Sequence, residues 1–176
     1  MCSLEAFKID LKGLEADETF REYNLDDDFF KALDASEVNG GALHVSVSIR
    51  KMPGFFELQF HAEGTVIVAC DVCLDDMEQP VKADHRLTVR LGSETTTGDD
   101  DVVTVSEDEG ILDTAWLIYE LIALAIPIKH VHAPGKCNSA MTQKLAELSG
   151  AVRSGKEETE ETDPRWSALL KLKNQE

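Results

Sequence analysis

The segment 64–74, GTVIVACDVCL, restricts the fold more than any other part of the chain. Residues 66–68 form an unbroken β-branched run, which predicts a buried strand. The strand ends at Cys70 and Cys73, which are separated by two residues. That spacing places two sulfurs on one tight turn and provides half of a tetrahedral zinc site. The remaining ligands have to come from a distant part of the chain.

The later segment 130–137, HVHAPGKC, provides them, directly after the most hydrophobic stretch of the sequence. We therefore predict that Cys70, Cys73 and Cys137 converge, with His132 or His130 as the fourth neighbour. Zinc is the candidate cofactor, because thiolate and imidazole are its usual ligands. In such a fold, the end of a central strand and the exit of a long helix are held together.

Two other interpretations of the cysteine pair remain open. Free cysteines are common small residues of hydrophobic cores, so the two thiols need not bind anything. A redox pair has the same spacing but normally lies at a helix N-terminus, which lowers the thiol pKa. Here Cys70 and Cys73 follow a strand and precede Asp75 and Asp76, which would raise it. We favour a structural zinc site or its relic over two plain thiols, and both over redox catalysis.

Charge restricts the partners of this chain of 176 residues. It has 34 acidic and 17 basic residues and a formal net charge of −17. Such a chain is repelled by phosphate backbones and anionic membranes, unless its bases cluster, and it associates readily with basic proteins. Lys82, Arg86 and Arg90 alternate along the outward side of a predicted strand. A solvated strand face explains them most simply, and they are also the best candidates for an anion-binding stripe and for RNA contact. The acidic stretch 94–109 is the opposite kind of surface, a candidate for holding a basic protein.

The compartment follows from what the sequence contains. The N-terminal stretch has no apolar core behind a basic start, which predicts no signal peptide. The apolar run 115–126 is shorter than the roughly 20 residues of a membrane span. Four cysteines without an export signal indicate a reducing compartment rather than a disulfide framework. We therefore expect a cytoplasmic protein without a membrane partner or a small-molecule substrate.

The expected fold is α+β, an antiparallel, curved or barrel-like sheet with one buried helix and a short C-terminal helix. Apolar and polar residues alternate, as they do in half-buried strands, over residues 5–10, 18–25, 43–49, 56–60, 79–92 and 102–105. A turn is expected at Glu63-Gly64. The acidic triplet Asp26-Asp27-Asp28 should cap a short helix, and Asp113 should cap a long one that ends at Pro127. The long helix is apolar on nearly every side, which predicts burial.

Within that helix, Glu120 should reach the rim or meet Lys129, Arg86 or Arg90. On the strand 79–92, His85 falls on the apolar side and is expected to be a core histidine rather than a ligand.

The domain boundaries follow from composition. Residues 1–148 should form a single domain, 149–163 an acidic flexible linker, and 164–176 a short amphipathic segment. An apolar segment on a flexible linker can dock on its own chain or on a partner.

Four segments in order resemble the YceD family, named for large ribosomal RNA subunit accumulation: ACDVCLD, ILDTAWLIYELIALAIP, HVHAPGKC and DPRWSALLKLK. The composition is similar to that of members from the Bacteroidetes group. The positions that match the family pattern are Cys70, Cys73, Asp113, Glu120, Pro127, His132 and Cys137. Some members have a second cysteine pair after the helix, but here Asn138, Ser139 and Ala140 follow Cys137.

The resemblance implies a non-enzymatic factor in biogenesis of the large ribosomal subunit, needed for 23S ribosomal RNA to accumulate. Its partners would be that RNA, a basic ribosomal protein, or both. The alternative is a cytosolic zinc- or thiol-dependent protein using Cys70 and Cys73, either an interaction module or a redox enzyme. An enzyme would need an open metal position and a general base, and the sequence offers no convincing base.

Overall fold

The computed structural model describes residues 4–93, 96–97 and 101–153. The chain divides into two compact units, Met1–Cys137 and Asn138–Glu176. The first unit contains the sheet and two α-helices, and the second contains the helix α3 (Ser139–Arg153).

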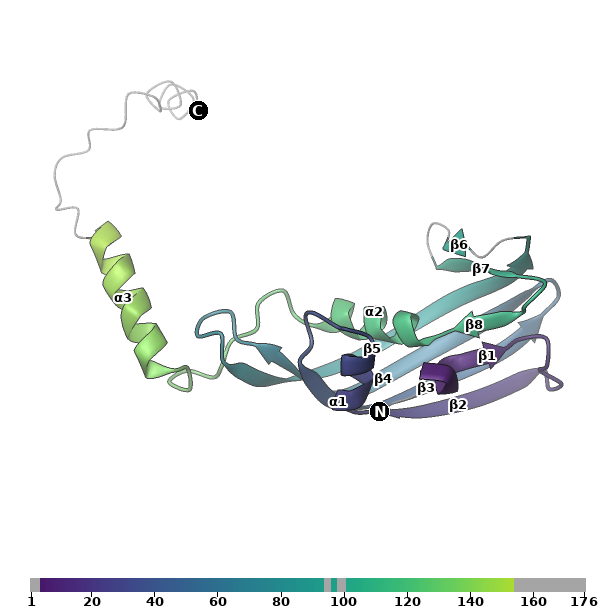
Figure 1. Ribbon diagram of the computed structural model, residues 1–176, viewed down its shortest axis with the longest axis horizontal. Helices are drawn as coiled ribbons and strands as arrows, with labels where there is room; N and C mark the ends of the chain where they lie inside the picture. Colours follow the sequence, from purple (N-terminus) through teal and green to yellow (C-terminus); the bar gives the residue numbers. More distant parts are fainter. Residues whose placement is uncertain (1–3, 94–95, 98–100, 154–176) are drawn as a thin grey trace, which may run out of the picture. The chain divides into compact units, whose positions relative to one another are not determined.

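The first unit is built on a six-stranded sheet in the order β2-β3-β4-β5-β7-β6 (Figure 1). Its strands are β2 (Glu18–Leu25), β3 (Gly40–Met52), β4 (Phe55–Ala69), β5 (Asp76–Gly92), β6 (Thr96–Thr97) and β7 (Val102–Ser106). A separate antiparallel pair joins β1 (Lys8–Asp10), preceded by a 3-10 turn at Leu4–Phe7, to β8 (Ile111–Asp113). The α+β class is confirmed.

The sheet is mixed, so the prediction of a purely antiparallel sheet was wrong. β5 and β7 pair in parallel, whereas the other neighbouring strands pair antiparallel. The reason is that β6 lies antiparallel to β7 and reverses the chain a second time before β7 begins. The order runs from an edge at β2 to an edge at β6. Closure of the sheet into a barrel stays a prediction.

The turn expected at Glu63-Gly64 does not exist, because β4 runs through both residues without interruption. Gly64 is paired with Leu43 on β3 and Val81 on β5. A Cβ atom at Gly64 would lie 2.3 Å from the Ala42 carbonyl oxygen. The glycine therefore permits close approach of two strands inside the sheet.

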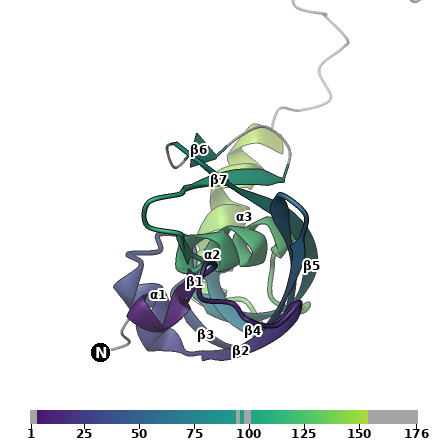
Figure 2. The ribbon, with the colours of Figure 1, turned by 90° about the vertical axis from the view of Figure 1, so that its right-hand side faces the viewer.

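The helix α2 (Ala115–Ala125) lies against β4 and β5 on the inner face of the sheet (Figure 2). Its buried residues Ala115, Ile118, Tyr119 and Ile122 join a core formed by the inward side chains of the strands. The helix is not buried all round, as its apolar sequence suggested: Trp116, Glu120 and Leu124 are exposed. Only one face of α2 has the sheet to pack against.

The start of α2 differs in detail from the prediction. Thr114 is the N-cap residue, and its fully buried hydroxyl donates to the Phe7 carbonyl at 2.7 Å. Asp113 ends β8, and its carboxylate accepts from the Ala115 N–H at 3.0 Å. Glu120 accepts from the Trp116 indole at 2.7 Å rather than meeting a base. The helix α1 (Asp27–Ala32) does begin as expected, with the Asp26 carboxylate accepting from the Phe29 N–H.

In the second unit, α3 begins after Asn138, whose side-chain oxygen accepts from the Ala140 N–H at 3.0 Å. The helix continues to Arg153, so it enters the first residues of the predicted 149–163 linker. The rest of that linker and the 164–176 segment lie outside the described residues, as do 94–95 and 98–100 of the acidic stretch. The proposed domain boundaries stay predictions.

Candidate metal centre

Cys70 and Cys73 lie on a tight turn between β4 and β5, and both are buried. The turn is closed by hydrogen bonds from Leu74 N–H to the Cys70 carbonyl and from Cys70 N–H to the Asp75 carbonyl, both at 2.9 Å. The Val72 N–H points at the Cys70 sulfur, 3.5 Å away. Leu74 takes a left-handed backbone conformation with φ 63°, which brings the chain round into β5. This geometry turns both sulfurs toward one side.

The chain after α2 docks on this turn through its own backbone. Asp71 N–H donates to the His130 carbonyl at 3.0 Å, and His130 N–H donates to the Asp71 carboxylate at 2.7 Å. The His130 ring is held by the Pro127 carbonyl, 3.0 Å from Nδ1. His130 Nε2 lies 3.6 Å from the Asp71 carboxylate, and His130 is not among the ligand groups that gather with the cysteines in the described residues.

His132 is therefore the histidine that meets the cysteines. Its Nδ1 lies 3.3 Å from the Cys73 sulfur and 4.0 Å from the Cys137 sulfur. The sulfurs of Cys70 and Cys137 are 3.9 Å apart, and the four ligand atoms all lie within 4.8 Å of one another. The structure thus brings together Cys70, Cys73, His132 and Cys137, and selects His132 where the sequence left His130 open.

The electrostatics of the cluster differ between its sulfurs. Burial raises the pKa of Cys70, but N–H groups of the Cys73, Val72 and His132 backbone together lower it more, to about 6. Burial, together with hydrogen bonds and charge interactions with Cys70 and Cys73, raises the pKa of Cys137 to about 11. The expectation that Asp75 and Asp76 would raise the thiol pKa was therefore wrong for Cys70, whose pKa is lowered by the N–H groups around its sulfur.

These residues fit a zinc ion. Zinc–sulfur bonds of about 2.3 Å in a tetrahedron put ligand atoms about 3.8 Å apart, close to the distances found here. The donor set is three thiols and one imidazole, a combination used by closed structural zinc sites. Zinc bound there would link the end of β4 to the chain that follows α2, 59 to 67 residues later.

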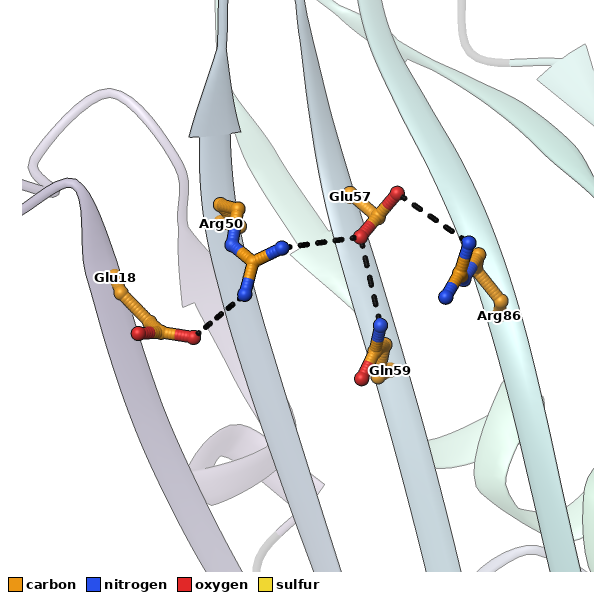
Figure 3. Close-up of polar contacts among 5 residues, drawn as sticks. All are labelled: Glu18, Arg50, Glu57, Gln59 and Arg86. Carbon is orange, nitrogen blue, oxygen red and sulfur yellow. Dashed lines mark hydrogen bonds and ion pairs between the residues drawn. The ribbon is translucent and has the colours of Figure 1, made fainter.

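The basic residues predicted for RNA contact lie on the outer face of the sheet, as expected from their alternation. Figure 3 shows that this face carries both signs of charge. Arg86 pairs with Glu57 at 3.9 Å, and Glu57 also pairs with Arg50 at 3.8 Å. Arg50 continues the ladder to Glu18 at 3.2 Å.

Lys82 lies in a second group of this kind. Its ammonium is 3.2 Å from Glu63, and this contact lowers the pKa of Glu63. His61 next to them contacts Asp84 at 2.7 Å. Arg90 has no ion pair within the described part of the chain. His85, expected in the core, is half-buried and lies 3.3 Å from Asp101.

The family whose sequence profile matches the chain is that of the large ribosomal RNA subunit accumulation protein YceD, over residues 58–173. The match covers well over half of the 176 residues. The chain belongs to the YceD family. No curated protein and no solved structure matches it significantly.

The YceD match confirms the resemblance stated from the sequence and connects the chain with accumulation of large-subunit ribosomal RNA. The matched range contains all four residues of the Cys/His cluster and the strand with Lys82, Arg86 and Arg90. None of the helices in the described ranges is long and apolar enough to cross a membrane.

Proposed function

We propose that this protein supports accumulation of 23S ribosomal RNA as a non-enzymatic cytoplasmic factor that holds a basic ribosomal protein. Membership of the YceD family points to accumulation of large-subunit ribosomal RNA, and the charge distribution supports a basic protein as the partner. An excess of 17 acids over bases favours a basic protein and opposes a phosphate backbone. The factor takes no small-molecule substrate in this proposal.

The observation that carries the proposal is the pairing on the outer face of the sheet. A phosphate-binding stripe needs uncompensated positive charge, but Glu63 neutralises Lys82 and Glu57 neutralises Arg86. The basic side chain of each pair is exposed, although Glu57 is half-buried, and such surface pairs contribute little to stability. They nevertheless oppose phosphate binding, because each base of the two pairs has a carboxylate next to it, which would repel the phosphate.

Part of the acidic stretch 94–109 lies within the residues that the structure describes, at the turn after β7. Glu107, Asp108 and Glu109 are exposed there, next to one another in the sequence. They form the described end of the stretch 94–109, which we assign to the basic ribosomal protein. The acids at 157–163, which we assign to the same role, lie outside the described residues.

We further propose that Cys70, Cys73, His132 and Cys137 hold a structural zinc ion. The support is a donor set of the right kind and size, whose four ligands would leave no open position for the water that a catalytic site needs. Zinc would stabilise the junction of β4, β5 and the chain after α2.

The test uses a strain that lacks the protein, complemented with variants. Lys82→Gln, Arg86→Gln and Arg90→Gln together remove the positive charge while keeping side-chain size, and exposed pairs permit the change without unfolding. We expect this variant to restore the ratio of 23S to 16S RNA. The matched variant Glu107→Gln, Asp108→Asn, Glu109→Gln should restore it poorly and retain less large-subunit protein in pull-downs.

The opposite pattern would refute the proposal: failure of the Lys82, Arg86 and Arg90 variant with full rescue by the acidic-turn variant. Tight binding of the purified parent to naked 23S fragments at physiological salt would refute it independently. In that case the affinity should fall with salt by roughly 0.9 log units per log unit for each phosphate contact on a duplex.

A further inference from the structure

The helix α2 presents two large apolar side chains and one carboxylate to solvent, and we call these three residues the α2 stripe. Trp116, Glu120 and Leu124 follow one another at four-residue spacing, which places them on one face of the helix. Trp116 is 51% exposed and Leu124 is 87% exposed. Large side chains this exposed on a helix that otherwise packs on the sheet mark an interaction surface.

A hollow of about 230 Å³ lies beside the stripe, between α2 and the strands β5 and β7. Its apolar lining comes from Phe60, Leu87, Val103, Leu117 and Leu121. The volume is below the 300–1,000 Å³ typical of sites for drug-sized molecules. The hollow is suited to one or two apolar side chains of a larger partner, the way anchor residues fill interface pockets.

The polar groups around this hollow are two carboxylates and one histidine, His85, whose Nε2 lies 3.3 Å from Asp101. Glu120 and Asp101 both line it, and neither lysine nor arginine does so among the residues that the structure describes. Glu120 is held in place by the Trp116 indole N–H at 2.7 Å, and the Trp116 ring contacts Tyr119 at 5.2 Å between centroids. An exposed indole beside an oriented carboxylate can receive an arginine or lysine through both charge and cation–π attraction.

We propose that the α2 stripe and its hollow bind a basic amphipathic segment of a protein partner, whose apolar residues fill the hollow and whose cations meet Glu120 and Asp101. This inference rests on the proposed function and names the surface that would hold the basic partner. Charge complementarity selects the occupant. A second copy would bring the same carboxylates and another net charge of −17 to the interface, and a nucleic acid would bring phosphates.

The chain offers its own reporter for the test. It has two tryptophans, so Trp166→Phe leaves Trp116 as the single tryptophan of the full chain, which can be excited selectively over the two tyrosines. The probe is a synthetic 14-residue amphipathic helix of leucine and arginine, and the matched probe has glutamate in place of arginine. We expect a saturable blue shift of Trp116 emission with the arginine peptide and at least about tenfold weaker binding of the glutamate peptide.

Variants locate the binding. Leu124→Asp should weaken the arginine peptide at least about tenfold, because that exposed side chain would be buried on binding. Glu120→Gln should weaken it severalfold. Phe20→Asp is the matched control: Phe20 is 66% exposed but lies on β2, and this variant should bind like the parent.

The inference would be overturned if Leu124→Asp and Phe20→Asp weakened peptide binding equally, or if both peptides bound equally well. It would also be overturned if an increase in protein concentration alone shifted Trp116 emission to the blue, which would assign the stripe to a second copy. At least tenfold tighter peptide binding after Leu170→Ser and Leu172→Ser would assign it to the chain's own C-terminal segment. If the parent and Leu124→Asp retain large-subunit proteins equally well, this inference fails and the proposed function stands. If the parent retains none, the proposed function fails.

Discussion

Replacing His132 by alanine should remove one ligand from the proposed zinc site, whereas the same change at His130 should leave the site intact. The two histidines are separated by one residue, but their rings have different neighbours. His132 Nδ1 faces the sulfurs of Cys73 and Cys137, and the His130 ring is held by the Pro127 carbonyl. The pair therefore provides a matched test of the geometry.

The magnitude follows from linkage between metal binding and folding. Loss of an outer-shell partner of a metal ligand weakens affinity about 10- to 100-fold, so loss of His132 itself should weaken it at least about 100-fold. At saturating zinc, a factor of about 100 in affinity corresponds to about 2.7 kcal/mol of unfolding free energy. For a domain of this size, that is a decrease of roughly 8 °C in Tm.

The assay is thermal unfolding of each protein with zinc and with a chelator, together with metal analysis of protein purified without chelator. The parent and His130→Ala should contain about one zinc per chain and show the same increase of Tm on adding zinc. His130→Ala should lose at most about 1 kcal/mol of unfolding free energy, equally with and without zinc, because the ring has one hydrogen bond, to the Pro127 carbonyl, and one longer contact, with Asp71. An unchanged zinc-dependent increase in His132→Ala, or its loss in both variants, would refute the assignment.

Three further predictions follow from single residues. Gly64→Ala should lower the free energy of unfolding by about 1–3 kcal/mol in urea denaturation, because the new Cβ would collide with the Ala42 carbonyl; an unchanged midpoint would contradict this account of β4. Asp113→Ala should lower it by about 1 kcal/mol through loss of the bond to the first turn of α2, and Asp113→Asn should restore most of that loss. Between pH 7 and 8, zinc affinity should increase about tenfold per pH unit for each proton that zinc displaces. Cys137, whose pKa is raised to about 11, has a proton to lose, whereas the pKa of Cys70 is already lowered to about 6. Calorimetry in buffers of different ionisation enthalpy would detect the released proton, and a zinc affinity independent of pH would contradict the prediction.

Local patterns in the sequence were sufficient for much of the fold. The alternation over 18–25 predicts β2 with the same ends that the structure has. Asp26 predicts the start of α1 because a carboxylate can satisfy a free N–H of the first turn. The spacing of Cys70 and Cys73 predicts a turn with two sulfurs on one side, and the scarcity of other ligand types points to the segment 130–137.

The failures involve information that is not local. Gly64 resembles a turn residue, but its role depends on how closely β3 approaches β4. The burial of α2 depends on how many elements cover it, which apolar periodicity does not specify. Glu120 is exposed, as one of its two predicted alternatives required, but its bond to Trp116 one helical turn away was not predicted. The choice of His132 over His130 required the backbone bonds that fix Asp71 against the chain after α2.

The most direct test of how this protein acts is crosslinking in growing cells, with sequencing of both the bound RNA and the bound peptides. If the acidic surface holds a basic ribosomal protein, crosslinks should join the chain to peptides of a large-subunit protein. They should persist when Lys82, Arg86 and Arg90 are changed to glutamine. Crosslinks only to 23S RNA, lost with those three substitutions, would contradict the account.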